Sequence, residues 1–147
     1  MFAREILAVK GEGSGIFSTS PDNLIPAAIE MMAQHNIGSL LVLNAAGAMV
    51  GIITERDILR AAHKYSCDLS KLKVSDLMTT NLIVAGPEDT VNYVRGIMTE
   101  NRIRHLPVVD GDKVLGLITF HDVAKATYKE VTFENELLKK YIKHWPE

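Results

Sequence analysis

The sequence predicts an α/β protein: two tandem βαββα units packed with pseudo-twofold symmetry, followed by a C-terminal helix. The chain aligns with itself, because residues 21–43 match 87–109 at an offset of 66 and residues 47–61 match 112–126 at an offset of 65. Each copy also alternates helical patterns with short apolar runs, and both copies end in the same strand-to-helix motif. A duplicated unit of mixed structure is the simplest fold with these properties.

The same elements are expected in the same order in each copy. Short strands are predicted over 15–19 and 81–85, and helices over 23–35 and 90–101, with Asp22 and Asp89 as N-caps. Two hairpins follow, 39–43 with 49–54 and 105–109 with 113–119. Their near-continuous apolar runs indicate strands buried on both faces. Closing helices are predicted to begin at Glu55 and Phe120.

These elements divide the chain into a first repeat over 14–66, a second over 74–130 and a helical extension over 131–147. The polar segment 64–74 is predicted to link the repeats, and 74–78 to form a short helix that enters the second. A unit of about 60 residues has a marginal core. We therefore expect the two repeats to pack together.

Composition narrows the classes of function. The chain has 147 residues, a formal net charge of −2 and one cysteine, Cys67. This charge predicts no general attraction to nucleic acid or to an anionic membrane. The apolar runs are too short to span a bilayer, and the charged residues 1–7 do not read as a signal peptide. A reducing cytoplasm is the simplest expected compartment for a single cysteine.

The strongest motif occurs once in each copy. Gly51-Ile52-Ile53-Thr54-Glu55-Arg56-Asp57 corresponds to Gly116-Leu117-Ile118-Thr119-Phe120-His121-Asp122. A helix N-terminus carries unpaired N–H groups and can seat a phosphate, while the aspartate can accept from two ribose hydroxyls and the glycine permits close approach. The same Thr-x-x-Asp pattern is also an ordinary capping box. Both interpretations stay open, and the duplication favours ligand binding.

With these motifs, the chain resembles the CBS-domain pair, or Bateman module, of the stand-alone bacterial type. The resemblance covers about residues 14–130 and includes the segments that open the second strand of each copy, Ile37-Gly38-Ser39-Leu40 and Ile103-Arg104-His105-Leu106-Pro107-Val108. It implies two quasi-equivalent clefts between the repeats that bind adenosine compounds such as AMP, ADP, ATP, NAD or S-adenosylmethionine. It also implies a flat homodimer.

Carried over by position, the resemblance assigns a role to each candidate ligand-binding residue. Asp57 and Asp122 would hold ribose hydroxyls, and Thr54 and Thr119 would contact ribose or phosphate. The first-strand residues that would flank the adenine are Ile16, Phe17, Leu82 and Ile83. The residues of the opposite wall would be Gly38, Ser39, Leu40, Arg104, His105, Leu106 and Pro107.

Charge near these positions favours a phosphorylated ligand. Arg56, Arg104, His105 and His121, together with Arg102, could meet a phosphate, whereas S-adenosylmethionine is itself cationic. We therefore expect a regulatory module that binds AMP or another adenine nucleotide, with NAD(H) as a further ligand. It would sense energy or redox state and signal in trans to an unknown effector protein. A structural or dimerisation module with vestigial clefts is the alternative.

No catalytic role is expected for the remaining features. The five histidines show no metal-ligand spacing, and Cys67 lies in a polar segment without a second cysteine nearby. The glycine-rich stretch 11–15 reads as a lead-in to the first strand. The C-terminal apolar stripe is predicted to pack either on a partner subunit or on the chain's own repeats, and consists of Phe133, Leu137, Leu138, Tyr141, Ile142 and Trp145.

Overall fold

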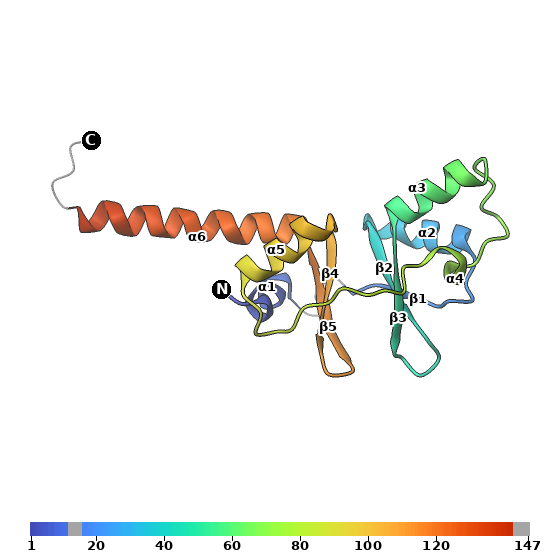
Figure 1. Ribbon diagram of the computed structural model, residues 1–147, viewed down its shortest axis with the longest axis horizontal. Helices are drawn as coiled ribbons and strands as arrows, with labels where there is room; N and C mark the ends of the chain where they lie inside the picture. The colour runs from blue at the N-terminus through green and yellow to red at the C-terminus, as the bar shows by residue number, and fades with distance from the viewer. Residues whose placement is uncertain (12–15, 143–147) are drawn as a thin grey trace. The chain divides into compact units, whose positions relative to one another are not determined.

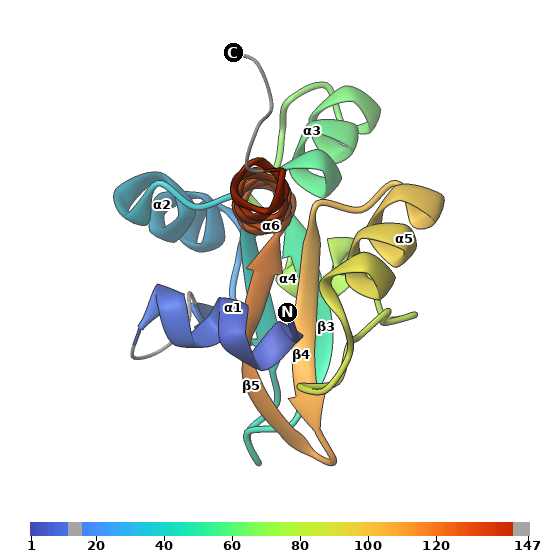
Figure 2. The ribbon, with the colours of Figure 1, turned by 90° about the vertical axis from the view of Figure 1, so that its left-hand side faces the viewer.

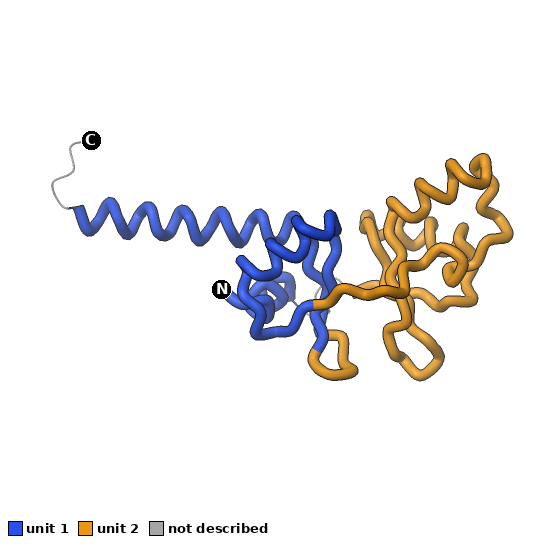
Figure 3. The backbone as a smooth tube through the Cα atoms, viewed as in Figure 1, with its two compact units in different colours: residues 1–14, 85–109, 115–147 blue, residues 15–84, 110–114 orange. Residues whose placement is uncertain are grey.

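The computed structural model of the chain describes residues 1–11 and 16–142. Residues 12–15 of the predicted glycine-rich lead-in, and Trp145 of the predicted stripe, lie outside them. The chain divides into two compact units: unit 1 is Met1–Ser14, Ala85–Val109 and Leu115–Glu147, and unit 2 is Gly15–Val84 and Asp110–Val114 (Figure 3). Unit 2 contains most of the first repeat, and unit 1 most of the second.

The sheet of unit 2 has three strands in the order β1-β2-β3 (Figure 1). Strand β1 (Ser18–Thr19) runs parallel to β2 (Ser39–Leu43), and β2 runs antiparallel to β3 (Met49–Thr54). The bounds of β2 and β3 confirm the predicted hairpin. Leu40, Leu41 and Val42 of β2 are buried, as their unbroken apolar run predicts, and Ser39 before them is buried too.

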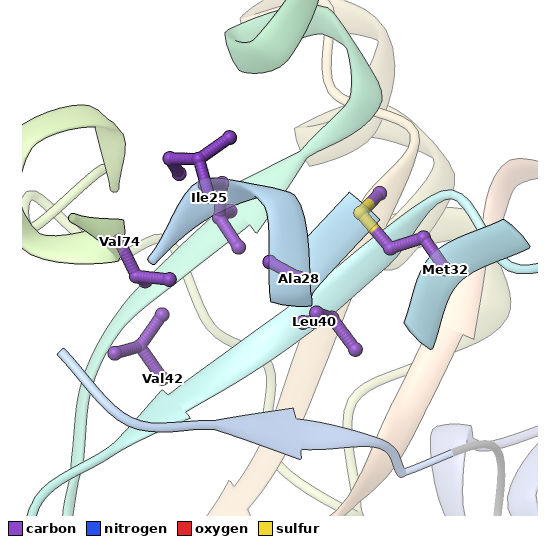
Figure 4. Packing of buried hydrophobic residues seen from close by; sticks show 7 residues of the cluster. Ile25, Ala28, Met32, Leu40, Val42 and Val74 are labelled. Atoms are coloured by element: carbon purple, nitrogen blue, oxygen red, sulfur yellow. The ribbon is translucent and has the colours of Figure 1, made fainter. Parts of the chain in front are cut away.

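Helices cover this sheet and close its core. Helix α2 (Ile25–His35) is followed in the chain order by α3 (Glu55–Lys64) and the short α4 (Val74–Leu77). Figure 4 shows how α2 and α4 direct apolar side chains onto β2. The fully or nearly fully buried members of this cluster are Ile25, Ala28, Met32, Leu40, Val42, Ile53 and Val74. Because Leu69 and Leu72 pack against the same cluster, the predicted linker 64–74 is partly a structural component of unit 2.

Unit 1 repeats the helix–hairpin–helix arrangement. Helix α5 (Val91–Asn101) precedes β4 (His105–Asp110) and β5 (Lys113–Thr119), and α6 (Phe120–Tyr141) closes the repeat. Figure 2, in which α6 is seen end-on, shows α5 and α1 (Ala3–Lys10) beside it. Both closing helices begin where the sequence predicts them, at Glu55 and Phe120.

The predicted first strand of the second repeat is reduced to one bridge. Ala85 pairs in parallel with Val108, and the equivalent pair in the first repeat is Thr19 of β1 with Val42 of β2. In β2, the Leu41 N–H donates to the Phe17 carbonyl, and the residue aligned with Leu41 is Pro107. Because proline has no N–H, the pairing cannot extend in the same way, and the prediction of a strand over 81–85 is wrong.

The predicted N-caps are also wrong. Leu24 and Thr90 occupy the N-cap positions of α2 and α5, and only Thr90 caps with its side chain, accepting from the Tyr93 N–H. Each of these two residues is held by a main-chain bridge, Leu24 to Lys73 and Thr90 to Phe2, so each helix starts later than its sequence pattern suggests. Asp89 instead closes a turn, accepting from the Gly86 N–H at 2.7 Å.

Those bridges reveal a part of the repeat that the sequence comparison missed. The Ala3 N–H donates to the Asp89 carbonyl at 2.8 Å, and the Val74 N–H donates to the Asn23 carbonyl, aligned with Asp89, at the same distance. Helices α1 and α4 are therefore equivalent flanking helices, each preceding the other repeat in the sequence. The third residue of each helix, Glu5 or Asp76, accepts a hydrogen bond from the main-chain N–H just before the helix. In both segments two apolar residues follow this acidic one, and that pattern was the signal in the sequence.

Candidate functional site

The first strand-to-helix corner (residues 54–57) is a complete capping box. The Asp57 N–H donates to Thr54 Oγ1 at 3.3 Å, and Asp57 Oδ2 accepts from the Thr54 N–H at 2.9 Å and from the Thr54 hydroxyl at 3.1 Å. Thr54 and Asp57 are half-buried. The capping interpretation of the motif is thus confirmed. A carboxylate accepts about four hydrogen bonds, so the two from Thr54 do not exhaust the capacity of Asp57.

Two predicted ligand residues of the first repeat, Gly38 and Ser39, contact this corner through the main chain. The Glu55 N–H donates to the Gly38 carbonyl at 3.0 Å, and Ser39 pairs with Thr54 across the β2–β3 ladder. Ser39 and Leu40 are buried, Ile16 is half-buried and Arg56 is exposed. The loop before β2 and the start of α3 therefore come together, as the predicted site requires.

The ring of Phe17 is already engaged within unit 2. Its centroid lies 4.5 Å from that of His35, and the side chain packs against the apolar cluster around β2. Its carbonyl accepts from the Leu41 N–H. The ring therefore supports the core, a role that the sequence pattern did not indicate.

Gly51, the glycine of the first motif, packs so closely against another segment of the chain that a side chain would not fit. A Cβ on Gly51 would lie 2.8 Å from Met78 Sδ and 3.0 Å from the Thr79 carbonyl oxygen. Thr79 pairs with Ile52 in both directions, donating to its carbonyl at 2.8 Å and accepting from its N–H at 3.0 Å. The absence of a side chain at Gly51 therefore lets residues 78–79 lie close against β3 and cover its edge.

The second strand-to-helix corner (residues 119–122) repeats the cap at the start of α6. The Asp122 N–H donates to Thr119 Oγ1 at 3.2 Å, and Asp122 Oδ2 accepts from the Thr119 N–H at 2.9 Å. The Phe120 N–H donates to the Arg104 carbonyl at 2.9 Å, as Glu55 does to Gly38. This corner therefore lies at the start of β4, where Arg104 is exposed, His105 is half-buried, and Leu106 and Pro107 are buried.

The remaining predicted residues are distributed more loosely. His121 is exposed on the first turn of α6. Leu82 and Ile83 are half-buried and belong to unit 2, outside any strand.

A lysine from a distant part of the sequence reaches the second corner. Lys10 Nζ at the end of α1 lies 2.8 Å from Asp122 Oδ2 and donates to the Leu117 carbonyl, also at 2.8 Å. Burial by itself would raise the pKa of Asp122, but the hydrogen bonds and charge of Lys10, with those from Thr119, hold this pKa below its usual value of 3.8. Sequence reasoning missed Lys10 because α1 was not recognised as part of the repeat.

Neither a metal-ligand cluster nor a membrane-spanning helix is found in the part of the chain that the structure describes. Among residues 1–11 and 16–142, no three His, Cys, Asp or Glu side chains are grouped as metal ligands would be. In that same part of the chain, no helix has the length and apolar character needed to cross a membrane.

The duplication of the corner agrees with the comparison of this chain with known protein families. The sequence profile of the CBS domain matches residues 14–64 and 74–129. The chain belongs to the CBS domain family. Among solved CBS structures, the CBS-domain containing protein ATU1752 from Agrobacterium tumefaciens superposes with a TM-score of 0.80 at 32% sequence identity, over 86% of this chain and 92% of that one.

CBS relatives occur both as small proteins and as parts of larger ones. The mitochondrial CBS domain-containing protein CBSX3 of Arabidopsis thaliana is 36% identical over 145 residues, which is 94% of this chain and 70% of the relative. An inosine-5'-monophosphate dehydrogenase from Nitrosopumilus maritimus is 34% identical over 130 residues, but these cover only 26% of the enzyme. The similarity to the dehydrogenase is thus confined to its CBS part.

One similar structure contains adenosine ligands. The CBS domain pair of protein MJ0100 was solved in complex with 5'-methylthioadenosine and S-adenosyl-L-methionine, and it superposes with a TM-score of 0.73 at 28% identity, over 88% of this chain and 98% of that one.

Proposed function

We propose that this CBS pair is a regulatory module that binds an adenine nucleotide, AMP, ADP, ATP or NAD(H), and signals energy or redox state in trans to an effector protein. One observation carries the proposal: both repeats present a threonine and an aspartate at the same strand-to-helix corner. Each corner offers helix N–H groups for an anion and a carboxylate for hydroxyls. The adenosine ligands of MJ0100 support this chemistry.

The assignment of ligand residues follows the two corners. Asp57 and Asp122 would accept from ribose hydroxyls, with Thr54 and Thr119 beside them. Because the Phe17 ring already packs against His35, we propose that the first strand contacts adenine mainly through its main chain. The exposed Arg56, Arg104 and His121 would favour a phosphorylated ligand over the cationic S-adenosylmethionine.

A ligand panel tests the proposal. Calorimetric titration and thermal unfolding should show binding of AMP, ATP or NAD(H), with GMP as the control for base selectivity, and should rank S-adenosylmethionine and 5'-methylthioadenosine below them. Binding stabilises the folded state by about RT ln(1 + [L]/Kd). Asp57→Asn keeps a side-chain oxygen for the cap but removes the charge, and it should weaken AMP binding about tenfold. Absence of any response to adenine compounds would contradict the proposal.

A structural module with vestigial clefts remains the second candidate, because both capping boxes are complete as protein structure alone. It predicts that Asp57→Asn changes stability slightly and leaves every ligand titration flat. The two candidates therefore differ in the calorimetric titrations of the unmodified protein.

We also propose a homodimer that pairs the distal part of α6. This part extends beyond the other elements of unit 1 (Figure 1), and the large apolar side chains exposed on it include Phe133, Leu137, Leu138 and Tyr141. Acidic residues, Glu134 and Glu136, precede basic ones, Lys139 and Lys140, along the helix. An antiparallel second copy would therefore bring opposite charges together while covering the apolar side chains.

The dimer is tested by light scattering coupled to size-exclusion chromatography. Leu137→Lys should shift the protein to monomer, whereas Asn135→Lys introduces the same residue at an exposed position on the other side of the helix and should retain the dimer. Equal behaviour of the two variants would contradict pairing through this face.

A further inference from the structure

The two corners differ in what occupies the aspartate. At both corners the aspartate Oδ2 accepts from the main-chain N–H of the threonine and the threonine side chain also bonds the carboxylate, but at the second corner Asp122 Oδ2 accepts from the Lys10 ammonium as well. The side chains of Lys10 and Asp122 are only 21% and 17% exposed. The ion pair is thus partly shielded from water, which strengthens it relative to a surface pair.

The backbone explains why a lysine reaches the second corner. After α4, the chain becomes extended and Thr79 donates its N–H to the Ile52 carbonyl. In the second repeat, the carbonyl equivalent to that of Ile52 belongs to Leu117. Helix α1 stays helical past the position equivalent to Thr79, so the donor to the Leu117 carbonyl is the Lys10 side chain. Lys10 is therefore held by two acceptors at once, one on β5 and one on α6.

Removing these two donors has different consequences. A threonine hydroxyl can rotate from Asp57 toward another acceptor at little cost, and it carries no charge. The Lys10 ammonium cannot leave without separating an ion pair and removing a hydrogen-bond donor from the Leu117 carbonyl. Ribose hydroxyls bound to Asp122 would have to compete with that ammonium.

We propose that Lys10 sets the nucleotide preference of the second corner by competing with ribose hydroxyls for Asp122, so that the first corner binds nucleotide more tightly. This proposal rests on the nucleotide-binding function proposed above. It makes Lys10 a specificity-determining residue, although it lies 112 positions from Asp122 in the sequence.

The test weakens the first corner with Asp57→Asn, fits a separate Kd for the second corner, and follows that Kd when the competitor is removed. Calorimetric titration of AMP into the Asp57→Asn/Lys10→Met protein should give a Kd about tenfold lower than into Asp57→Asn alone, the effect of one charged hydrogen bond. Asp57→Asn/Lys129→Met is the matched control, because Lys129 is exposed on α6, and its Kd should equal that of Asp57→Asn. Lys10→Gln provides a second uncharged variant should Lys10→Met fold poorly.

The outcomes separate the two proposals. Unchanged or weaker AMP binding after loss of Lys10, in a protein whose first corner binds AMP, would overturn the competition while leaving the proposed function intact. Absence of AMP binding to the unmodified protein and to all variants would overturn both.

Discussion

The first and second corners share one capping geometry and differ in their surroundings. The β3 edge beside the first corner is covered by main chain, because Thr79 pairs with Ile52, whereas the equivalent carbonyl on β5 is bound by the Lys10 side chain. Both carbonyls are thereby satisfied. Two similar sequences can therefore reach the same capping geometry and still differ in their surroundings, because a lysine from another helix pairs with the aspartate of the second corner.

The largest expected effect concerns the covered edge of β3. Gly51→Ala should destabilise the protein by about 1–3 kcal/mol, because the new Cβ would overlap Met78 and the Thr79 main chain. The free energy of unfolding in urea measures this cost. Gly96→Ala is the control, since a Cβ there meets nothing within 4 Å in α5 and should raise stability by up to about 1 kcal/mol. Equal effects of the two substitutions would show that the segment 78–79 does not constrain Gly51.

The capping threonines give the next comparison. Thr54→Ala should cost about 1 kcal/mol, the usual value for a lost N-cap. Thr119→Ala should cost less, because Lys10 still holds Asp122 in place at the second corner. Urea unfolding of both variants, with Thr54→Ser and Thr119→Ser as hydroxyl-retaining controls, measures the difference. A larger loss for Thr119→Ala would contradict the support attributed to Lys10.

The ion pair itself should make a smaller, pH-dependent contribution. Because the pKa of Asp122 is lowered on folding, its pairing stabilises the protein above the usual value of 3.8 and is lost as the pH falls through the folded pKa. Lys10→Met should therefore lower stability by about 0.5–1 kcal/mol near neutral pH, and the difference should shrink in acid. Carboxyl NMR should show a higher pKa for Asp122 in Lys10→Met. An unchanged pKa would contradict the pairing.

The smallest effect is expected at the ends of α2 and α5. The two helices end in left-handed residues at aligned positions, Asn36 with φ 52° and Arg102 with φ 54°. Asparagine tolerates this conformation better than arginine does. Arg102→Asn should raise the free energy of unfolding by about 0.5 kcal/mol, and Asn36→Arg should lower it by a similar amount. Equal stability of Arg102→Asn and the unmodified protein would contradict this explanation.

Much of the repeat could be predicted from local sequence. The hairpins and the closing helices follow from apolar runs, turn residues and the Thr-x-x-Asp pattern, all of which act over a few residues. Errors occur where distant segments determine the local structure. The late starts of α2 and α5 depend on bridges to Lys73 and Phe2, and the lost first strand of the second repeat depends on Pro107. The role of Gly51 likewise depends on a segment about 28 positions later, as its contact with Thr79 shows.

By itself, the sequence determined the duplicated unit and the pair of capping corners, because hydrophobic periodicity and helix capping are set by neighbouring residues. Only the tertiary structure decided which flanking helix joins which repeat and which cation meets which carboxylate. The pairing of Lys10 with Asp122 arises from a helix packing against a repeat that begins much later in the chain, and no local pattern encodes that contact.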